Sequence, residues 1–173
     1  MGIHAAKVAR AAGAQVVGFD RHQATLDAAT ELGLDARPAD DTSAETDLVV
    51  KASGGGVDVV IDTVGRDDTI EQADRLVRPG GRIVGVGYSP TSAYRVASTR
   101  LVLGEIQVVG SRYAHRDDLE HAVAMVAARP VRPIVGMVRP LEAVNEIFDA
   151  LAADDVVGRA VLDVAGVTEG NLP

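Results

Sequence analysis

The sequence predicts an α/β fold built on a parallel sheet. Segments rich in β-branched residues alternate with segments whose apolar residues recur at helical spacing, an alternation that is typical of β-α-β units. The segment VDVVIDTVG, residues 57–65, is a nearly continuous run of this kind, as expected for a central strand buried on both faces. With 173 residues, the chain is long enough to bury a sizeable core.

Each element has its own signal along the chain. Apolar residues that share one helical face predict helices over 3–12, 22–32, 44–53, 117–128 and 141–152, and a further helix from Asp67 or Asp68 to Val77. Strands are expected over 15–20, 34–40, 57–65, 82–87, 106–112, 134–139 and 159–164. Pro79-Gly80-Gly81 predicts a tight turn, and residues 88–105 form a long connection without a clear pattern.

Composition excludes several classes of function. The net charge of −8 argues against a nucleic-acid partner, which would require a basic face. The chain has no cysteine, which excludes disulfides and thiolate zinc sites within it, and its four histidines show no metal-ligand spacing. No apolar run approaches the ~20 residues that span a bilayer, and the first residues do not resemble a secretion signal. We therefore expect a cytoplasmic protein with no membrane partner.

Asp20 is the first candidate for a binding residue. It ends the predicted strand 15–20, and Gly2 lies eighteen residues earlier, at the start of the preceding helix. In dinucleotide-binding folds the last glycine of a glycine-rich loop opens such a helix, and an acid ~20 residues later binds the ribose hydroxyls. A carboxylate there repels the 2′-phosphate of NADP, so this interpretation favours NAD. Alternatively, Asp20 only ends a strand and begins a turn, and Arg21 either stacks on the adenine or is a surface cation.

Small residues follow the two strongest strands. Val64 and Gly65 come after strand 57–63, and Gly85 and Gly87 lie at the end of strand 82–87. Ligands of open α/β sheets bind at the carboxyl ends of the strands, and glycine lets a ligand lie against the backbone. The alternative is that these glycines serve close helix packing or tight turns.

Five segments in order carry a family resemblance. GIHAAKVARAAGAQVVGFD, VDVVIDTVG, LVRPGGRIVGVG, GEIQVVGSR and VVGRAVLDV resemble the medium-chain dehydrogenase/reductase family, and they are most similar to its zinc-dependent alcohol dehydrogenases. The resemblance covers residues 2–165 and implies a Rossmann-like, doubly wound parallel sheet. It implies NAD(H) as cofactor and partner, and a homo-oligomer, dimer or tetramer.

The resemblance also implies roles for individual residues. Gly2 matches the last glycine of the phosphate-binding loop, and Asp20 matches the acid that marks NAD use. Arg159 matches an arginine that reaches the cofactor pyrophosphate, a role that suits a bidentate guanidinium. The remaining matches line the cofactor cleft or approach the nicotinamide: Val64, Gly65, Val86, Gly87, Tyr88, Ser111 and Arg112.

Measured against this family, the chain begins inside the fold. The first strand, most of the glycine-rich loop and the N-terminal catalytic domain with its zinc ligands are missing, so we predict neither catalytic residues nor metal ligands here. Residues 1–112 are expected to form an incomplete dinucleotide-binding domain, 113–165 a C-terminal helix-strand-helix-strand segment, and 166–173 a frayed tail. Strands 15–20 and 57–63 lose a shared neighbour, which favours association.

The resulting hypothesis is a cofactor-binding fragment of an NAD-dependent, zinc-type alcohol dehydrogenase that is inactive by itself. Zinc is expected only in the full-length relative. Three alternatives stay open: a non-catalytic remnant or partner subunit without nucleotide binding, a zinc-free quinone oxidoreductase of the same superfamily, and a methyltransferase. Asp20 opposes the quinone oxidoreductase, whose relatives favour NADP. The late segments GEIQVVGSR and VVGRAVL have no place in a methyltransferase.

Overall fold

The computed structural model of the chain describes residues 1–39, 44–128, 131–164 and 166. Its contacts divide the chain into two compact units. The first unit contains Met1, Ile3–Ala36 and the described residues from Leu119 onward, and the second contains Gly2 and Arg37–Asp118. The domain boundaries at 112 and 165 stay predictions, and the expected tail lies outside the described residues except for Gly166.

The N-terminal part of the first unit is a helix-strand-helix-strand segment. Its elements are α1 (Gly2–Ala11), β1 (Val17–Asp20), α2 (Gln23–Glu31) and β2 (Asp35–Pro38), and β1 pairs with β2. Each helix is followed by a glycine with positive φ, Gly13 at 91° and Gly33 at 70°, a conformation that favours glycine just after a helix end. Ile3, Ala29 and Leu34 form the buried cluster between these helices.

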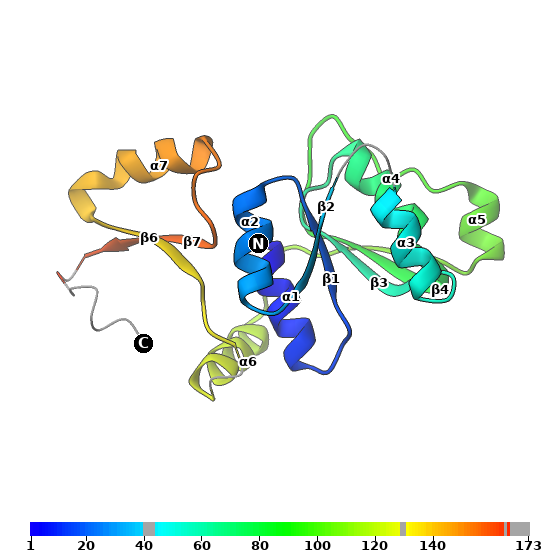
Figure 1. The fold of residues 1–173 in the computed structure, drawn as a ribbon, viewed down its shortest axis with the longest axis horizontal. Helices are drawn as coiled ribbons and strands as arrows, with labels where there is room; N and C mark the ends of the chain where they lie inside the picture. Colours follow the sequence, from blue (N-terminus) through cyan, green and yellow to red (C-terminus); the bar gives the residue numbers. More distant parts are fainter. Residues whose placement is uncertain (40–43, 129–130, 165, 167–173) are drawn as a thin grey trace. The chain divides into compact units, whose positions relative to one another are not determined.

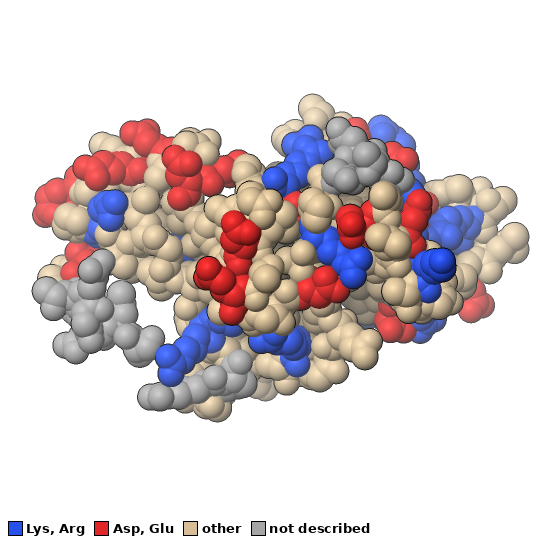
Figure 2. Space-filling view, viewed as in Figure 1, with Lys and Arg blue, Asp and Glu red and all other residues tan. Residues whose placement is uncertain are grey.

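The C-terminal part of the first unit contributes a second pair of strands. Its elements are α6 (Arg116–Ala127), β6 (Val135–Pro140), a 3-10 turn η1 (Leu141–Ala143), α7 (Val144–Ala152) and β7 (Arg159–Asp163). β6 and β7 are parallel, and α7 connects them and packs on β6 (Figure 1). Acidic side chains gather over α7 in Figure 2, where the sequence carries Glu142, Glu146, Asp149, Asp154 and Asp155.

The second unit is built on a three-stranded parallel sheet. Its elements are α3 (Ala44–Ala52), β3 (Val57–Asp62), α4 (Asp67–Leu76), β4 (Val77–Gly85), α5 (Ser98–Leu103) and β5 (Gln107–Gly110). The strand order is β3-β4-β5, and Val60, Ile83 and Val108 lie side by side across it. α4 packs on β3 and β4, with α3 beside α4 (Figure 1). Ala73, Val77, Ile83 and Ile106 form the buried core.

Two elements of the second unit differ from the sequence prediction. The connection 88–105 contains α5, a six-residue helix that is too short to show a periodic pattern. β4 starts at Val77 rather than at residue 82, because Val77 pairs with Val57 before the register jumps to the pairing of Val59 with Arg82. The predicted turn Pro79-Gly80-Gly81 is therefore an irregularity inside a strand.

Strand pairing confirms the α/β class with parallel sheets. The described strands form three separate sheets, so β1 and β3 share no neighbour among them. β3 has a single described partner, β4, and its other edge carries unpaired backbone groups.

Candidate functional site

Asp20 occupies the carboxyl end of β1, as the sequence predicts. Its Oδ1 accepts a hydrogen bond from the backbone N–H of His22 at 2.9 Å, which turns the chain toward α2. Arg21, between the two, is exposed. Among the described residues, Oδ2 of Asp20 accepts no hydrogen bond, so one carboxylate oxygen can still accept a bond from a ligand hydroxyl. Asp20 therefore begins a turn, as one of the two interpretations of the sequence predicts, and its binding role stays a prediction.

Arg159 is placed by the pairing of β6 and β7. It is the first residue of β7, it lies opposite Val135, and its backbone N–H donates to the carbonyl of Ile134 at 2.9 Å. Gly158, just before it, has φ +88°, and a Cβ there would overlap the Ile134 carbonyl. Glycine is therefore required for β7 to start beside β6 at this point.

Helix α1 holds the start of β6. The backbone N–H of Ile134 donates to Nε2 of His4 at 3.0 Å, and Nζ of Lys7 donates to the carbonyl of Arg132 at 2.5 Å. These two bonds join α1 to residues about 130 positions later, and the pairing with β7 then brings Arg159 to the same end of the unit. This explains how the charge of an arginine near the C-terminus can affect groups in the first turn of α1.

The charges at this end favour an anion. Burial lowers the pKa of the Met1 amine, and the charge of Arg159 lowers it further, whereas Asp20 raises it. Burial also lowers the pKa of His4, with further lowering by Arg159, the Met1 amine and Lys7. A neutral His4 accepts the bond from Ile134 at Nε2, so its Nδ1 carries the proton, and this atom has no partner among the described residues. Cations at the start of a helix suit a phosphate group.

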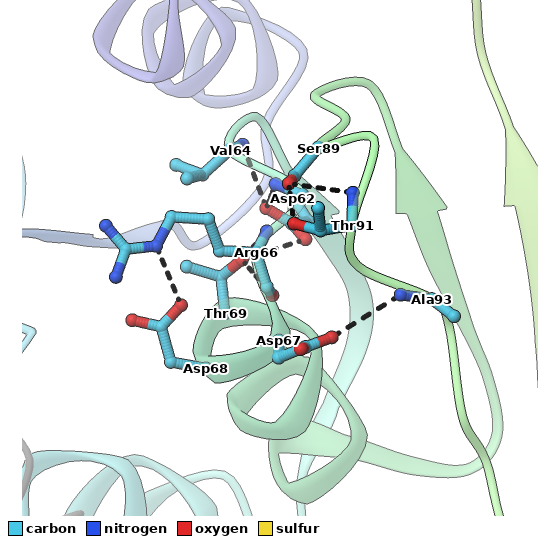
Figure 3. A network of polar contacts seen from close by, with 10 residues as sticks. Asp62, Val64, Arg66, Asp67, Asp68, Thr69, Ser89, Thr91 and Ala93 are labelled. Atoms are coloured by element: carbon cyan, nitrogen blue, oxygen red, sulfur yellow. Dashed lines mark hydrogen bonds and ion pairs between the residues drawn. The ribbon is translucent and has the colours of Figure 1, made fainter.

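In the second unit, Asp62 organises the candidate residues. It is the last residue of β3 and is only 5 % exposed. Its Oδ1 accepts the N–H groups of Val64 and Gly65, both at 2.9 Å. Its backbone carbonyl accepts the N–H groups of Val86 and Gly87, at 2.8 and 3.0 Å. One residue therefore holds the turns that follow two neighbouring strands, and Figure 3 shows its bond to Val64 in the first of them.

The other carboxylate oxygen of Asp62 binds two hydroxyl groups. Thr69 Oγ1 donates to Oδ2 at 3.1 Å and also accepts the N–H of Arg66 at 3.1 Å, at the start of α4. Tyr94 Oη donates to Oδ2 at 3.0 Å from the connection that follows β4. Burial, together with the charge and hydrogen bond of Asp62, raises the pKa of Tyr94 to about 12. The phenol therefore stays protonated, and remains a donor, at neutral pH.

The glycines at the strand ends serve contact between the two turns. A Cβ on Gly65, whose φ is +73°, would overlap the carbonyl of Gly87 and come within 2.6 Å of the Tyr88 Cα. A Cβ on Gly87 would overlap the backbone of Thr63. At Gly85, the Tyr94 phenol fills the position of the missing side chain. Protein atoms thus fill the space into which a side chain at these glycines would point. A ligand could contact the backbone of these glycines only from another side.

The remaining candidates lie around these turns or after β5. Val64 and Tyr88 are exposed, with Tyr88 at 87 %. The N–H of Ser111 donates to the Gly85 carbonyl at 2.8 Å, which carries the strand pairing one residue beyond β5. The guanidinium of Arg112 lies 4.6 Å from the ring centre of Tyr113 and donates to its hydroxyl at 3.2 Å. The backbone segments that follow β3, β4 and β5 therefore come together at the carboxyl edge of one sheet.

The structure thus arranges the candidates in two groups. Asp20, Arg21 and Arg159 belong to the first unit. Gly2 is grouped with the second unit, where a Cβ on it would lie 3.4 Å from Thr63 Oγ1. The other candidates of the second unit are Val64, Gly65, Val86, Gly87, Tyr88, Ser111 and Arg112.

Sequence reasoning missed the residues that hold these groups in place. Asp62 was visible as an acid at the end of a buried strand, a position where a charged residue requires partners. Thr69 and Tyr94 carry no comparable signal, because their partners are remote in sequence or come from a connection without a pattern. Sequence reasoning assigns no role to His4, whereas the structure makes it half-buried and bonded to Ile134.

Comparison with known proteins assigns the family. Residues 1–128 match the protein family described as "Zinc-binding dehydrogenase". The chain belongs to this zinc-binding dehydrogenase family. The resemblance to the medium-chain dehydrogenase/reductase superfamily that the five sequence segments predict is thereby confirmed.

Individual members of the family are similar over nearly the whole chain. An acryloyl-coenzyme A reductase of Metallosphaera sedula is 32 % identical over 163 residues, which are 94 % of this chain and 47 % of the relative. The crystal structure of an NAD-dependent alcohol dehydrogenase matches with a TM-score of 0.80 and 28 % identity, over 94 % of this chain and 48 % of that one. The alcohol dehydrogenase of Aeropyrum pernix matches with a TM-score of 0.80 and 27 % identity, over 93 % and 46 %.

These matches confirm the Rossmann-like fold class. The chain spans about half the length of the relatives that it matches. Within residues 1–39, 44–128, 131–164 and 166, no group of three or more His, Cys, Asp or Glu side chains could hold a metal ion, so the described residues do not fit the family's zinc. None of the helices that the structure describes has the length and apolar character needed to cross a membrane.

Proposed function

We propose that this chain is the nicotinamide-cofactor-binding part of an NAD-dependent oxidoreductase. The observation that supports this most directly is the position of Asp20 at the carboxyl end of β1, directly after helix α1, in a member of the zinc-binding dehydrogenase family. A carboxylate at this position accepts hydrogen bonds from the two ribose hydroxyls of NAD and repels the 2′-phosphate of NADP.

The other candidates then share the work of binding. By the family resemblance, Arg159 would bind the pyrophosphate, and Gly2 would give a phosphate access to the backbone. The turns after β3 and β4, which Asp62 holds, and Ser111 and Arg112 after β5 orient the nicotinamide ring. When bound, the nicotinamide accepts or donates a hydride. The chain itself supplies binding and orientation.

For the reaction we propose hydride transfer between an alcohol and NAD, since two of the similar structures are alcohol dehydrogenases. We expect the 173 residues alone to show no turnover of alcohols, because they provide no described zinc ligands. NAD-dependent oxidation of a secondary alcohol by the purified chain would contradict this. Composition supports a cytoplasmic location, and the half-exposed apolar residues of the sheet support a homo-oligomer.

A second candidate substrate class is an enoyl thioester, because the relative with 32 % identity is an acryloyl-coenzyme A reductase. For such a substrate, a bound nicotinamide would supply the hydride for the β-carbon of the double bond, and a proton would add to the α-carbon. The NADH-loaded chain should distinguish the two classes. A change in NADH fluorescence on adding acryloyl-coenzyme A, but not on adding a ketone, the hydride acceptor of an alcohol dehydrogenase, would favour the thioester.

The deciding experiment is a calorimetric titration of the purified chain with NADH and then with NADPH. We expect saturable NADH binding and weaker NADPH binding. Asp20→Ser should weaken NADH binding by about tenfold and reduce the preference over NADPH, because the bonds to the ribose and the repulsion of the phosphate are both lost. Glu31→Gln, which removes an exposed acid from α2, is the matched control. A folded chain that binds neither nucleotide would instead support the remnant.

A further inference from the structure

The connection between β4 and α5 is attached at consecutive residues to the end of β3 and the start of α4. Tyr94 Oη donates to Asp62 Oδ2 at 3.0 Å. On either side of it, the N–H of Ala93 donates to Asp67 Oδ1 at 3.4 Å (Figure 3), and the Arg95 guanidinium lies 3.6 Å from the same oxygen. The Asp67 contacts are exposed and weak. The bond to Asp62 is therefore the main attachment.

The tyrosine is built into the sheet on which it lies. Its ring packs against the core cluster around Ile83, and its phenol fills the space left by the missing side chain of Gly85. A Cβ on Gly85 would come within 2.6 Å of the Tyr94 hydroxyl, so a larger residue there would push the tyrosine away. The glycine at this strand end thus makes room for Tyr94.

The partner of Tyr94 is the residue that fixes both glycine turns. Asp62 holds Val64 and Gly65 through Oδ1, and Val86 and Gly87 through its carbonyl. Its carboxylate is buried, and its four side-chain hydrogen bonds all come from uncharged donors. Removing one donor leaves the carboxylate incompletely bonded, and it then shifts or draws in water. A shift of the carboxylate moves the backbone amides that it holds.

We propose that Tyr94 is a positioning residue for the nicotinamide end of the site: its hydrogen bond to Asp62 fixes the turns at Val64-Gly65 and Val86-Gly87, and thereby sets the affinity for the reduced cofactor. This proposal rests on the proposed function. Tyr94 acts only through Asp62 and through the connection that begins at Tyr88, and it need not touch the cofactor. The phenol is protonated at neutral pH, so it donates this bond.

The test is Tyr94→Phe in the complete chain, which retains the ring and removes only the hydroxyl. Tyr113→Phe is the matched control, because Tyr113 is 86 % exposed and its hydroxyl bonds only to Arg112 among the described residues. Two properties are measured for each protein: hydrogen exchange of the backbone amides in residues 62–70 and 84–94, and the dissociation constant of NADH by titration.

The expected result is faster exchange at the amides of Val64, Gly65, Val86 and Gly87 in Tyr94→Phe, with NADH binding about tenfold weaker. Tyr113→Phe should match the parent chain in exchange at these four amides. Unchanged exchange in Tyr94→Phe would overturn the proposal, because the turns would then be fixed without the phenol. Faster exchange with unchanged NADH affinity would also overturn it, because Tyr94 would then serve the fold alone.

A further variant separates charge from geometry. In Asp62→Asn the amide oxygen can still accept the two backbone N–H groups, and its NH2 can donate to the hydroxyls of Thr69 and Tyr94, which rotate to accept. We expect Asp62→Asn to retain most of the NADH affinity, and loss as large as in Tyr94→Phe would count against positioning by hydrogen bonds. If the parent chain is folded but binds no NADH, the proposed function fails and this proposal fails with it. If the parent chain binds NADH and Tyr94→Phe binds it equally tightly, this proposal fails and the proposed function stands.

Discussion

At the scale of single residues, the main finding is that a buried carboxylate holds the candidate site together. Asp62 receives bonds from its own turn, from the next strand's turn, from α4 and from Tyr94. The bonds from Val64, Gly65, Thr69 and Tyr94 end on its carboxylate, whereas those from the next strand's turn end on its backbone carbonyl. Loss of the carboxylate would leave these four donors without an acceptor, some of them buried.

Asp62→Ala is therefore expected to lower the free energy of unfolding by about 2–4 kcal/mol. Urea unfolding of the two proteins followed by circular dichroism gives this difference. The control is Asp58→Ala on the same strand, where an exposed ion pair with Arg78 is lost and a change below about 0.5 kcal/mol is expected. Equal effects at the two positions would show that the hydrogen bonds of Asp62 do not stabilise the fold.

His4 makes stability depend on pH. Burial lowers its pKa in the folded chain, followed by the charges of Arg159, the Met1 amine and Lys7. The unfolded chain therefore binds the proton more readily, and stability should fall as the pH falls below the unfolded value of about 6.5. His4→Gln keeps an acceptor for the Ile134 N–H but does not titrate. We expect a flatter stability profile in this variant, measured by denaturant unfolding over about pH 5 to 8. The Met1 amine also contributes to the pH dependence of stability in both proteins. If stability falls equally steeply with pH in the two proteins, His4 is not the source of this dependence.

At the scale of elements, the turns after the strands are determined by close approach of backbone to backbone. The sequence shows glycines at these strand ends but not what lies beside them. Gly65 and Gly54 have the same φ, +73°, yet a Cβ on Gly65 would overlap the Gly87 carbonyl, whereas one on Gly54 would meet nothing within 4 Å. Alanine substitutions at the two glycines therefore share the conformational cost of a positive φ, and only the substitution at Gly65 adds steric overlap.

Gly65→Ala should consequently destabilise the chain by at least about 2 kcal/mol more than Gly54→Ala, since the overlap with backbone cannot be relieved by a rotamer change. Thermal or urea unfolding of both variants measures the difference. Because the β3 turn would have to move, Gly65→Ala should also weaken NADH binding, and Gly54→Ala should not. Similar stability of the two variants would mean that the turns can separate without loss.

At the scale of the whole molecule, one row of apolar residues in the three-stranded sheet is partly exposed on the outer strands. Ile61, Val84 and Val109 lie side by side across β3, β4 and β5, on the face opposite Val60 and Ile83. Ile61 is 45 % and Val109 42 % exposed. Exposed apolar surface joined to an unpaired strand edge favours association.

We expect the purified chain to associate, with an apparent mass that rises with concentration in sedimentation velocity. Ile61→Thr, which retains a β-branched side chain and adds a hydroxyl, should shift the equilibrium toward the monomer. Circular dichroism provides the control for retained folding. A parent chain that stays monomeric at every concentration would contradict this, and so would a variant that associates equally.

The order of elements could be predicted from the sequence because it depends on local properties. Helical spacing, β-branched runs and glycines after helices are set by residues close in the chain, and the predicted α/β alternation and the family follow from them. Asp20 could be placed at a strand end by the same reasoning. The short helix α5 and the early start of β4 could not, because six residues show no period and Val77 is extended by pairing with Val57.

By itself, the sequence determined the class of fold, the family and the residues at the strand ends. Only the tertiary structure decided what those residues do to one another. The bonds of His4 to Ile134 and of Tyr94 to Asp62, and the contact of Gly65 with Gly87, join positions between 22 and 130 residues apart. Such contacts form once packing has removed water and fixed the distance between backbones, and no local pattern specifies them.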